Sequence, residues 1–296
     1  MPYKGEFAAL LTALLWTATA ISFEIASRRV GSLAVNVLRL SFAFVYLFVF
    51  TWIYRGQPLP LDASLHAWIW LLLSGLVGFV FGDYFLFRAF GIMGSRTTML
   101  IQTLVPPITA FTGLFLLGER MIPRHLLGMA LTMGGIALVV LNRSNSNGKL
   151  GLSFPVKGLL FALAGALGQA IGLVLSKVGM GSYDPFASTQ IRIIAGMTGF
   201  IGLTLALGKW GVVRNALPNR VAMRGIVAGS VFGPFLGVSF SLLAIQNTQA
   251  GIASTLMALT PVLIIAPSAM VFRQKVTWKE VAGAVVSVSG AALFFL

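Results

Sequence analysis

Hydrophobic residues run through this chain in long stretches, separated by short segments that carry most of the charges. A stretch of about 20 apolar residues is long enough for a helix to cross the ~30 Å hydrocarbon core of a bilayer. Helices suit that environment because their backbone groups bond to one another. The pattern predicts ten such helices, near 6–27, 33–54, 66–89, 95–117, 122–141, 155–178, 186–207, 222–243, 250–272 and 278–296.

The pattern occurs twice along the chain. At an offset of 155 residues, ten positions recur: Gly78, Gly82, Phe85, Ala89, Leu104, Pro106, Gly128, Gly135, Leu138 and Leu141 match Gly233, Gly237, Phe240, Ala244, Leu259, Pro261, Gly283, Gly290, Leu293 and Leu296. Nearer the amino terminus the offset is 153, so Lys4-Gly5 matches Lys157-Gly158 and Arg39 matches Arg192. Residues 1–146 and 147–296 are therefore expected to be two repeat units.

Five helices per repeat is an odd number, so the second repeat should enter the membrane from the opposite side. We expect an all-α membrane protein of two inverted five-helix repeats around a central cavity. In such a pair, what one repeat does at the outer mouth the other does at the inner mouth, which is a route to alternating access.

Composition agrees with a chain that lies within the bilayer. Of 296 residues, 57% are hydrophobic and 9% are charged, far less charge than a soluble domain of this length carries. The net charge of +14 is spread over short loops and forms no continuous patch, which argues against a nucleic-acid partner. Lipid and a small-molecule substrate are the expected partners, and a monomer is favoured because both repeats are in one chain.

The loop cations predict an orientation. With the amino terminus outside, 13 fall in cytoplasmic loops, namely Arg28, Arg29, Arg96, Arg143, Lys149, Lys157, Lys209, Arg214, Arg220, Arg224, Arg273, Lys275 and Lys279. Five fall on the other side, namely Lys4, Arg55, Arg120, Arg124 and Lys177. The positive-inside rule then places both termini on the non-cytoplasmic side of the inner (plasma) membrane. Residues 4–20 also resemble a secretory leader, but their repeat partner at 155–178 favours a permanent helix.

Several kinds of chemistry lack the residues they need. There is no cysteine, and His66 and His125 fall in predicted loops, so neither a metal site nor a cofactor is expected. A membrane enzyme would need a nucleophile next to a base, and an ATP-driven pump would need a Walker A loop. The sequence has neither pattern, which argues against both classes. A channel predicts a continuous polar path, whereas the polar residues here are sparse.

Small residues and prolines are duplicated in the same order. Ser74, Gly78 and Gly82 are spaced by four, as are Gly229, Gly233 and Gly237, which favours close approach of helices in lipid. Pro106, Pro107 and the duplicate Pro261 remove backbone donors in predicted membrane segments. Two interpretations stay open, a kink that serves packing and a hinge or unwound turn that lines a cavity.

These features together resemble a known family. The motifs are Asn36-Val37-Leu38-Arg39 in the second helix, Pro106, the turn Leu117-Gly118-Glu119-Arg120, and Gly128 followed by Gly134-Gly135. In order and spacing the whole chain resembles the ten-helix EamA-type branch of the drug/metabolite transporter superfamily, and looks most like its aromatic amino-acid exporters. The second copy departs at Arg273-Gln274-Lys275, without a carboxylate, so we read Glu119 as pairing locally with Arg120 or Arg124. The resemblance implies secondary transport of small organic molecules such as amino acids or drugs.

Polar and aromatic groups at mid-membrane depth are the candidates for binding substrate, since burying them in lipid is costly. Trp16 lies in the middle of the first helix, whereas the other tryptophans lie at segment ends. The predicted substrate-binding set is Trp16, Tyr84, Gln102, Gln169, Ser239 and Met257. An aromatic ligand would stack on Trp16 and Tyr84 while the glutamines bond its polar end. The alternative for each residue is a bond to a neighbouring helix.

Charged residues inside the predicted helices are the candidates for coupling or gating. Asp83 and Glu24 are the two carboxylates there, and a proton-coupled carrier needs one that protonates in one state. Glu24 has Arg28 four residues on, a spacing for a helical ion pair. Arg39 and Arg192 either snorkel to headgroups, one towards each face, or contact a substrate carboxylate. Because carboxylates are so scarce, facilitated diffusion without a coupling ion is a serious alternative.

Overall fold

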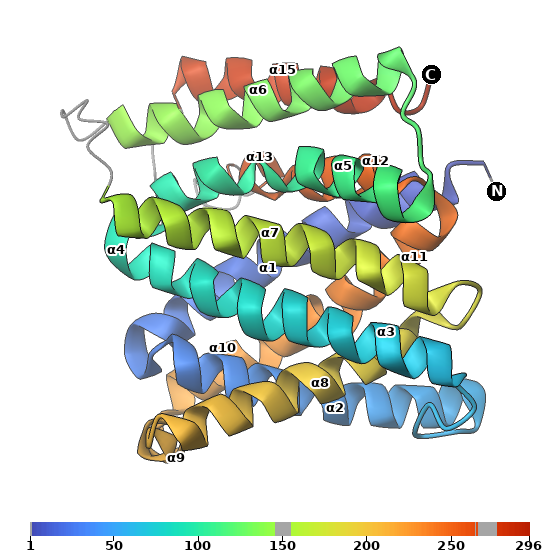
Figure 1. Ribbon diagram of the computed structural model, residues 1–296. Coiled ribbons are helices and arrows are strands. Elements are labelled where there is room, and N and C mark those ends of the chain that lie inside the picture. The colour runs from blue at the N-terminus through green and yellow to red at the C-terminus, as the bar shows by residue number, and fades with distance from the viewer. Residues whose placement is uncertain (1, 146–154, 264, 266–276) are drawn as a thin grey trace.

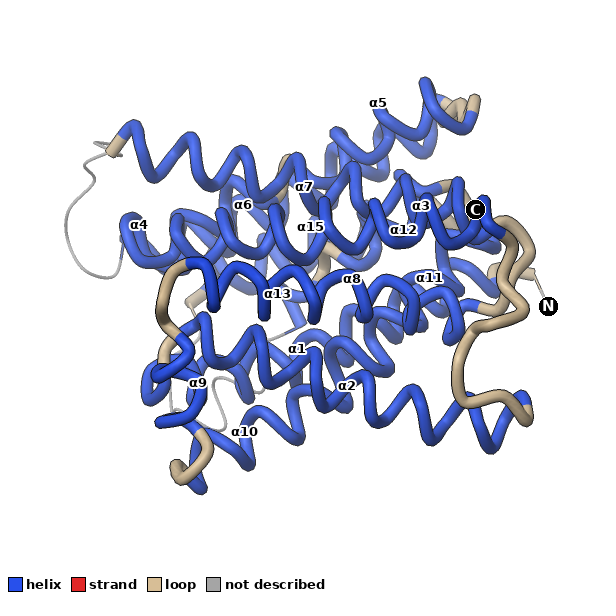
Figure 2. The backbone as a smooth tube through the Cα atoms, turned by 60° about the horizontal axis from the view of Figure 1, so that its bottom comes forward, coloured by secondary structure: helices blue, strands red, loops and turns tan. Residues whose placement is uncertain are grey.

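The computed structural model describes residues 2–145, 155–263, 265 and 277–296, with the side chains of Ile21, Glu24, Arg28 and several residues of 90–100 and 140–145 left out. The regular elements of these residues are helices, as Figure 2 shows. They are α1 (Lys4–Val30), α2 (Ser32–Arg55), α3 (Leu65–Gly75), η1 (Leu76–Asp83), α4 (Tyr84–Gln102), α5 (Val105–Leu117), α6 (Pro123–Asn145), α7 (Val156–Met180), α8 (Pro185–Ala206), α9 (Trp210–Ala216), α10 (Arg220–Ser230), η2 (Val231–Gly237), α11 (Val238–Asn247), α12 (Ala250–Met257), α13 (Thr260–Leu263) and α15 (Trp278–Ala292).

The bundle has the dimensions and surface of a membrane protein. Six helical stretches are long and apolar enough to span a bilayer: 4–27, 32–55, 65–89, 156–180, 185–206 and 220–247. Two shorter apolar stretches cover 105–117 and 250–263. Large apolar side chains point outward, among them Ile53 (81% exposed) and Phe115 (70%). Water would penalise such a surface and lipid does not, so we describe a multi-pass helical membrane protein.

The sequence repeat reappears in the backbone. Each copy contains a π-helical segment, η1 in the first and η2 in the second, that starts 155 residues apart at Leu76 and Val231. Each copy also has a helix break 155 residues apart, between α4 and α5 and between α12 and α13. In both copies a proline, Pro106 or Pro261, is the second residue of the helix that restarts. Proline is tolerated there because the first turn of a helix has no internal partner for its N–H groups.

The two copies exchange their packing partners. η1 packs on α7, the first helix of the second copy, and η2 packs on α1, the first helix of the first copy. At the crossing of η1 with α7 the two backbones come close because glycines of both helices face each other there. A Cβ on Gly172 of α7 would lie 2.7 Å from Cα of Gly78. The predicted close approach through small residues is therefore confirmed.

The helices α6 and α15 lie side by side and contact each other reciprocally (Figure 1). Gly128 approaches the carbonyl of Gly290, and Gly135 approaches the carbonyl of Gly283. Between them Thr132 and Ser287 each donate a hydroxyl bond to the other's carbonyl, at 3.3 and 3.2 Å. Residue numbers rise along one helix as they fall along the other, so the two equivalent helices are antiparallel.

Capping side chains fix the first residues of α3 and α8. Ser64 accepts the N–H of Ala67 at 3.1 Å at the start of α3, and Asp184 accepts that of Ala187 at 2.9 Å at the start of α8. Such caps satisfy backbone donors that a helix leaves unpaired. They define where α3 and α8 begin, and hence how far along the bundle Asp83 and Arg192 lie.

Candidate substrate site

Asp83 is the centre of a charged cluster inside the bundle. It ends η1 and is 5% exposed. Its Oδ2 forms an ion pair with Nη2 of Arg39 from α2, and its Oδ1 accepts a hydrogen bond from Nε2 of Gln169 of α7 at 2.7 Å. Both carboxylate oxygens thus have a partner, which is the condition for keeping a charge buried at tolerable cost.

Arg192 of α8 is the second cation of this cluster. It is 5% exposed and lies close enough to Asp83 for the two charges to interact. Its guanidinium lies over the ring of Phe79, 4.9 Å from the centroid. Its Nε has no hydrogen-bond partner among the described residues. We call Arg39, Asp83, Gln169 and Arg192 the charged cluster; it joins residues of both copies and carries two positive charges against one negative.

Glycines of α3 and η1 make the room that the cluster occupies. A Cβ on Gly82 would lie 3.2 Å from the backbone nitrogen of Gln169, and one on Gly78 would lie 3.2 Å from Nη2 of Arg192. At Gly75 a Cβ would lie 2.4 Å from the carbonyl of Arg192, which no backbone shift of a few tenths of an ångström relieves. The glycine spacing of this helix therefore positions both α7 and α8 around Asp83.

Aromatic rings surround the cations of the cluster. The guanidinium of Arg39 lies 5.6 Å from the ring centroid of Phe23 and 6.0 Å from that of Phe87. An arginine over an aromatic face is stabilised by the quadrupole of the ring, the more so where water is absent. Together with Phe79 these rings give the charged cluster apolar walls. The arrangement suits a small molecule that has both a charged and an apolar part.

Comparison with known families decides the class of protein. A model of the EamA-like transporter family matches residues 3–141 and again residues 156–296. The chain belongs to the EamA-like transporter family. It is thus a member of the drug/metabolite transporter superfamily, whose proteins move small metabolites across membranes and are not enzymes. A comparison with curated proteins gives no match.

A solved crystal structure has the same fold as this EamA-like transporter. It superimposes with a TM-score of 0.74 over 99% of this chain and 97% of the other, at 16% sequence identity. At that identity the likeness shows the fold alone. The two family matches are separated by 14 residues and fall on the two halves that the internal repeat defines.

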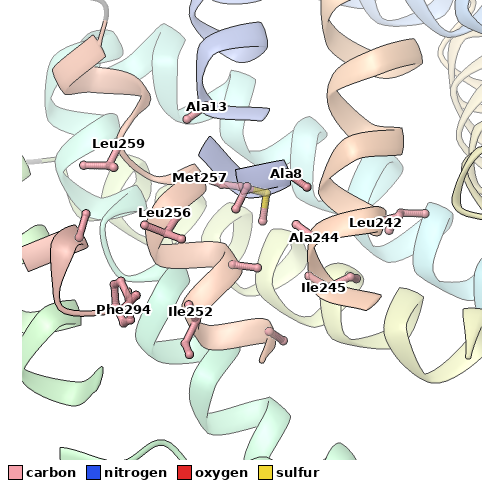
Figure 3. Close-up of a cluster of buried hydrophobic side chains, with 14 of the residues drawn as sticks. Ala8, Ala13, Leu242, Ala244, Ile245, Ile252, Leu256, Met257, Leu259 and Phe294 are labelled. Carbon is pink, nitrogen blue, oxygen red and sulfur yellow. The ribbon is translucent and has the colours of Figure 1, made fainter. Parts of the chain in front are cut away.

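Of the predicted binding residues, Gln169 belongs to the charged cluster and Trp16 lies at the other crossing. The indole of Trp16 packs on η2, where a Cβ on Gly237 would lie 2.7 Å from its Nε1. Trp16 also packs against the apolar cluster that contains Met257, which Figure 3 draws with Ala8 and Ala13 of α1. Met257 is 2% exposed, so in this transporter it is part of the core.

The remaining predicted binding residues bond to nearby groups. The hydroxyl of Tyr84 accepts a hydrogen bond from Nη2 of Arg88 at 2.9 Å on the same helix. Nε2 of Gln102 donates to the carbonyl of Ala162 on α7 at 3.2 Å. The hydroxyl of Ser239 donates to the carbonyl of Phe235 at 2.6 Å, one turn before it. Tyr84 and Gln102 are both on α4, which packs on α7 beside the charged cluster.

The expected coupling and hinge residues have distinct positions. Asp83, Arg39 and Arg192 meet in the charged cluster, so the two arginines interact with one carboxylate instead of each serving its own face. Glu24 is on α1, but its side chain lies outside the described residues. Pro106 is buried and Pro261 half-buried, each just after its helix break. In the part of the chain that the structure describes, no three metal-ligating side chains come together.

A second polar network ties the copies together at the end of the bundle where the termini lie (Figure 1). Nζ of Lys177 forms an ion pair with Glu119 at 2.5 Å and donates to the carbonyl of Thr248 at 2.6 Å. Glu119 also accepts the backbone N–H of Ala250 at 2.7 Å. The expectation that Glu119 pairs locally with Arg120 or Arg124 is wrong, because its partners come from the other copy.

The loops at the same end form a further link between the copies. Asp62 pairs with Arg55 at 2.6 Å and accepts the hydroxyl of Tyr183 at 2.7 Å. Burial, and then the hydrogen bond to Asp62, raise the pKa of Tyr183 to about 12. Burial alone would raise the pKa of Asp62, but the hydrogen bonds from Tyr183 and Arg55 outweigh it and lower that pKa. The loop between α2 and α3 is thereby attached to the loop between α7 and α8.

Proposed function

We propose that this transporter is a secondary carrier of small organic metabolites that works by alternating access of two inverted five-helix repeats with ten transmembrane helices. The antiparallel, reciprocal contact of α6 with α15 supports inversion, because these helices are equivalent in the repeat. The exchanged packing of η1 on α7 and η2 on α1 supports it too. The two helix breaks lie at equivalent places, and we assign hinge roles to Pro106 and Pro261 there.

For the substrate we propose amino acids with aromatic side chains. The observation that carries this proposal is the charged cluster, which offers a carboxylate and two guanidinium groups to the ends of a zwitterion. The rings of Phe23 and Phe79 beside the cations suit the apolar part of such a substrate. Gln169 reaches the cluster directly, and Tyr84 follows Asp83 in the chain. Gln102 bonds the carbonyl of Ala162 on α7, about two turns from Gln169.

We assign Trp16 of the first copy, together with Ser239 and Met257 of the second copy, to a further wall that lines the substrate path as the repeats move. Ser239 is the repeat equivalent of Tyr84, and Met257 is that of Gln102. We place the carrier in the inner (plasma) membrane as a monomer, with both termini on the non-cytoplasmic side, as the distribution of loop cations indicates. The glycine faces of α6 and α15 are used within the chain, which supports a monomer.

Counterflow in liposomes tests this function. Vesicles that hold purified protein are loaded with unlabelled phenylalanine or tryptophan and given trace label outside, without a pH gradient. We expect saturable accumulation of label that Gln169→Leu and Trp16→Ala both abolish. Exchange of another amino acid or a drug, but not of aromatic ones, would keep the carrier and discard the substrate. Flux that does not saturate would indicate a pore, and no flux over a broad metabolite panel would discard the carrier.

Proton-coupled export of drugs or other metabolites is the alternative that one observation favours. Asp83 is a buried carboxylate whose partners include the side chain of Arg39, so a change of state that withdraws Arg39 would favour protonation. Asp83→Asn separates the two mechanisms. If coupling depends on Asp83, the variant exchanges labelled substrate but no longer accumulates it when a pH gradient is imposed. If transport is facilitated diffusion, wild-type protein does not respond to the gradient either.

A further inference from the structure

The two arginines of the charged cluster are equivalent in the repeat but not in their surroundings. Arg39 and Arg192 are related by the offset of 153 residues. Arg39 has an ion pair with Asp83. The repeat equivalent of Asp83 is Val238, so the second copy supplies no carboxylate at the matching place. The repeat therefore has one buried cation, Arg192, and one partly buried cation, Arg39, with a single carboxylate between them.

Arg192 lacks the partners that a buried guanidinium requires. Arginine keeps its charge at any accessible pH and has five N–H donors. Among the described residues the enclosed Nε of Arg192 has no hydrogen-bond partner, which is also true of the Nε of Arg39; unlike Arg39, Arg192 forms no ion pair there. Asp83, the nearest carboxylate, already gives one oxygen to Arg39 and the other to Gln169. An uncompensated charge at this depth costs several kcal/mol unless another group pays for it.

Snorkelling does not account for this side chain. An arginine that snorkels places its guanidinium in the headgroup region, whereas Arg192 is 5% exposed and is held over Phe79. The helix that faces it is shaped around it, since Gly78 leaves its Nη2 the space that a Cβ would take. The contacts with Phe79 and Gly78 therefore hold the guanidinium of Arg192 inside the bundle.

We propose, on the basis of the carrier function above, that Arg192 is the residue that binds the carboxylate of the substrate. The planar guanidinium matches a carboxylate in a two-bond geometry, and the pair would neutralise the surplus charge of the cluster. The ligand class is a small monocarboxylate with an apolar group that lies against Phe79. Amines without a carboxylate are excluded, because the cluster already has a net positive charge. Arg192 is enclosed in this structure, so the ligand reaches it in an open state of the carrier.

Binding of three matched probes to purified protein in detergent tests this assignment. The probes share a phenyl ring and differ in their polar group: phenylacetate, the neutral phenylacetamide and the cationic phenethylamine. We expect phenylacetate alone to quench tryptophan fluorescence and raise the melting temperature. Arg192→Gln should weaken that binding about 10- to 100-fold, the effect of losing a charge-assisted hydrogen bond. Arg192→Lys, which keeps the charge without the fork, should recover part of it.

A comparison of stabilities separates a binding role from a structural one. Arg192→Gln should unfold at the same temperature as wild type or higher without ligand, because it removes an unpaired charge. Arg39→Gln should unfold at a lower temperature, because it leaves Asp83 without its cation. If Arg192→Gln unfolds at a lower temperature than Arg39→Gln, Arg192 is a structural residue and the proposal is wrong. The proposal is also wrong if Arg192→Gln binds phenylacetate as tightly as wild type does.

The outcome is independent of the proposed amino-acid substrate. Phenylacetate binding that depends on Arg192, in a protein that exchanges no amino acid, would discard the amino-acid carrier and keep the carboxylate site. Exchange of phenylalanine that Arg192→Gln leaves unchanged in half-saturation concentration would keep the carrier and discard the site. If wild-type protein binds phenylacetate and phenylacetamide equally well, the assignment of Arg192 as a carboxylate-binding residue is wrong as well.

Discussion

At the crossing of η1 with α7, glycine lies on glycine and a carboxylate bonds an amide. Gly78 meets Gly172 there, and Asp83 accepts a hydrogen bond from Gln169. At the equivalent crossing of η2 with α1, glycines lie on side chains. Gly229 meets the ring of Phe23, Gly233 meets Thr19 and Gly237 meets Trp16.

Three pairs of equivalent residues account for the difference. Asp83 corresponds to Val238 by the offset of 155, and Gln169 and Gly172 correspond to Trp16 and Thr19 by the offset of 153. The π-helical segment and the glycine spacing are the same in both copies. Duplication has therefore preserved the glycine spacing and the π-helical segment at both crossings, while the carboxylate and the amide occur at only one of the two. We refer to the two as the polar crossing and the apolar crossing.

The largest effect should come from giving the polar crossing the residue of its partner. Asp83→Val leaves Arg39 buried without a carboxylate, which costs about 3–5 kcal/mol. Thermal unfolding in detergent measures this loss. Val238→Ala at the apolar crossing is the matched control, and it should cost on the order of 1–2 kcal/mol as a loss of apolar contact. Equal costs would mean that the ion pair contributes nothing to stability.

Removing the side-chain amide of Gln169 at the polar crossing should cause the next largest loss of stability. Gln169→Leu removes a hydrogen bond to a charged group, worth about 1.5–3 kcal/mol. Gln102→Leu is the control, because Gln102 of α4 bonds a neutral carbonyl of α7, and it should cost about 0.5–1.5 kcal/mol. Unfolding in denaturant gives both values. A larger loss for Gln102→Leu would contradict a special role for Asp83.

Glycine substitutions should distinguish backbone contact from side-chain contact. Gly172→Ala puts a Cβ 2.7 Å from a backbone atom of Gly78, so we expect a loss of about 1–3 kcal/mol. Gly233→Ala meets the side chain of Thr19 at 2.8 Å, which can rotate, so its loss should be smaller. Gly202→Ala has open space and should stabilise by roughly 0.4–1 kcal/mol. Melting temperatures that rank these variants otherwise would refute the close crossing.

The smallest effect should come from the loop link, which lies outside both crossings. Because folding raises the pKa of Tyr183 to about 12, its contribution to stability is present below pH 10 and disappears as pH rises through 12. The ultraviolet absorbance titration of wild type minus that of Tyr183→Phe should show one tyrosine with a midpoint near 12. A midpoint near 10 would show that Tyr183 does not bond Asp62 in solution.

The sequence predicted the repeated parts of this fold because duplication leaves a record in residue spacing. The glycine contacts and the helix breaks at Pro106 and Pro261 follow from spacing within one helix. The charged cluster does not. Arg39 and Asp83 are 44 residues apart, and which helix faces each depends on packing and on the extra turn width of η1. The rule that buried charges pair could have linked them.

The expected partner of Glu119 was wrong because contacts between helices far apart in the sequence depend on packing. Its neighbours in sequence, Arg120 and Arg124, were the visible candidates, whereas its partner Lys177 comes from the other copy. Local spacing gives contacts along a helix but not contacts between helices. The separate positions of Trp16 and Gln169 illustrate this too, because equivalent residues in a repeat lie at different crossings when the copies exchange partners.

The central claim is that the polar crossing is where this transporter handles its substrate. Its most direct test is the initial rate of phenylalanine counterflow in liposomes for wild type, Asp83→Asn and Val238→Ala. We predict that Asp83→Asn lowers the rate about 10-fold or more, as loss of a charged contact should, while Val238→Ala stays close to wild type. If the two variants slow counterflow equally, or if neither does, Asp83 has no role in transport that its repeat equivalent Val238 lacks, and the account is wrong.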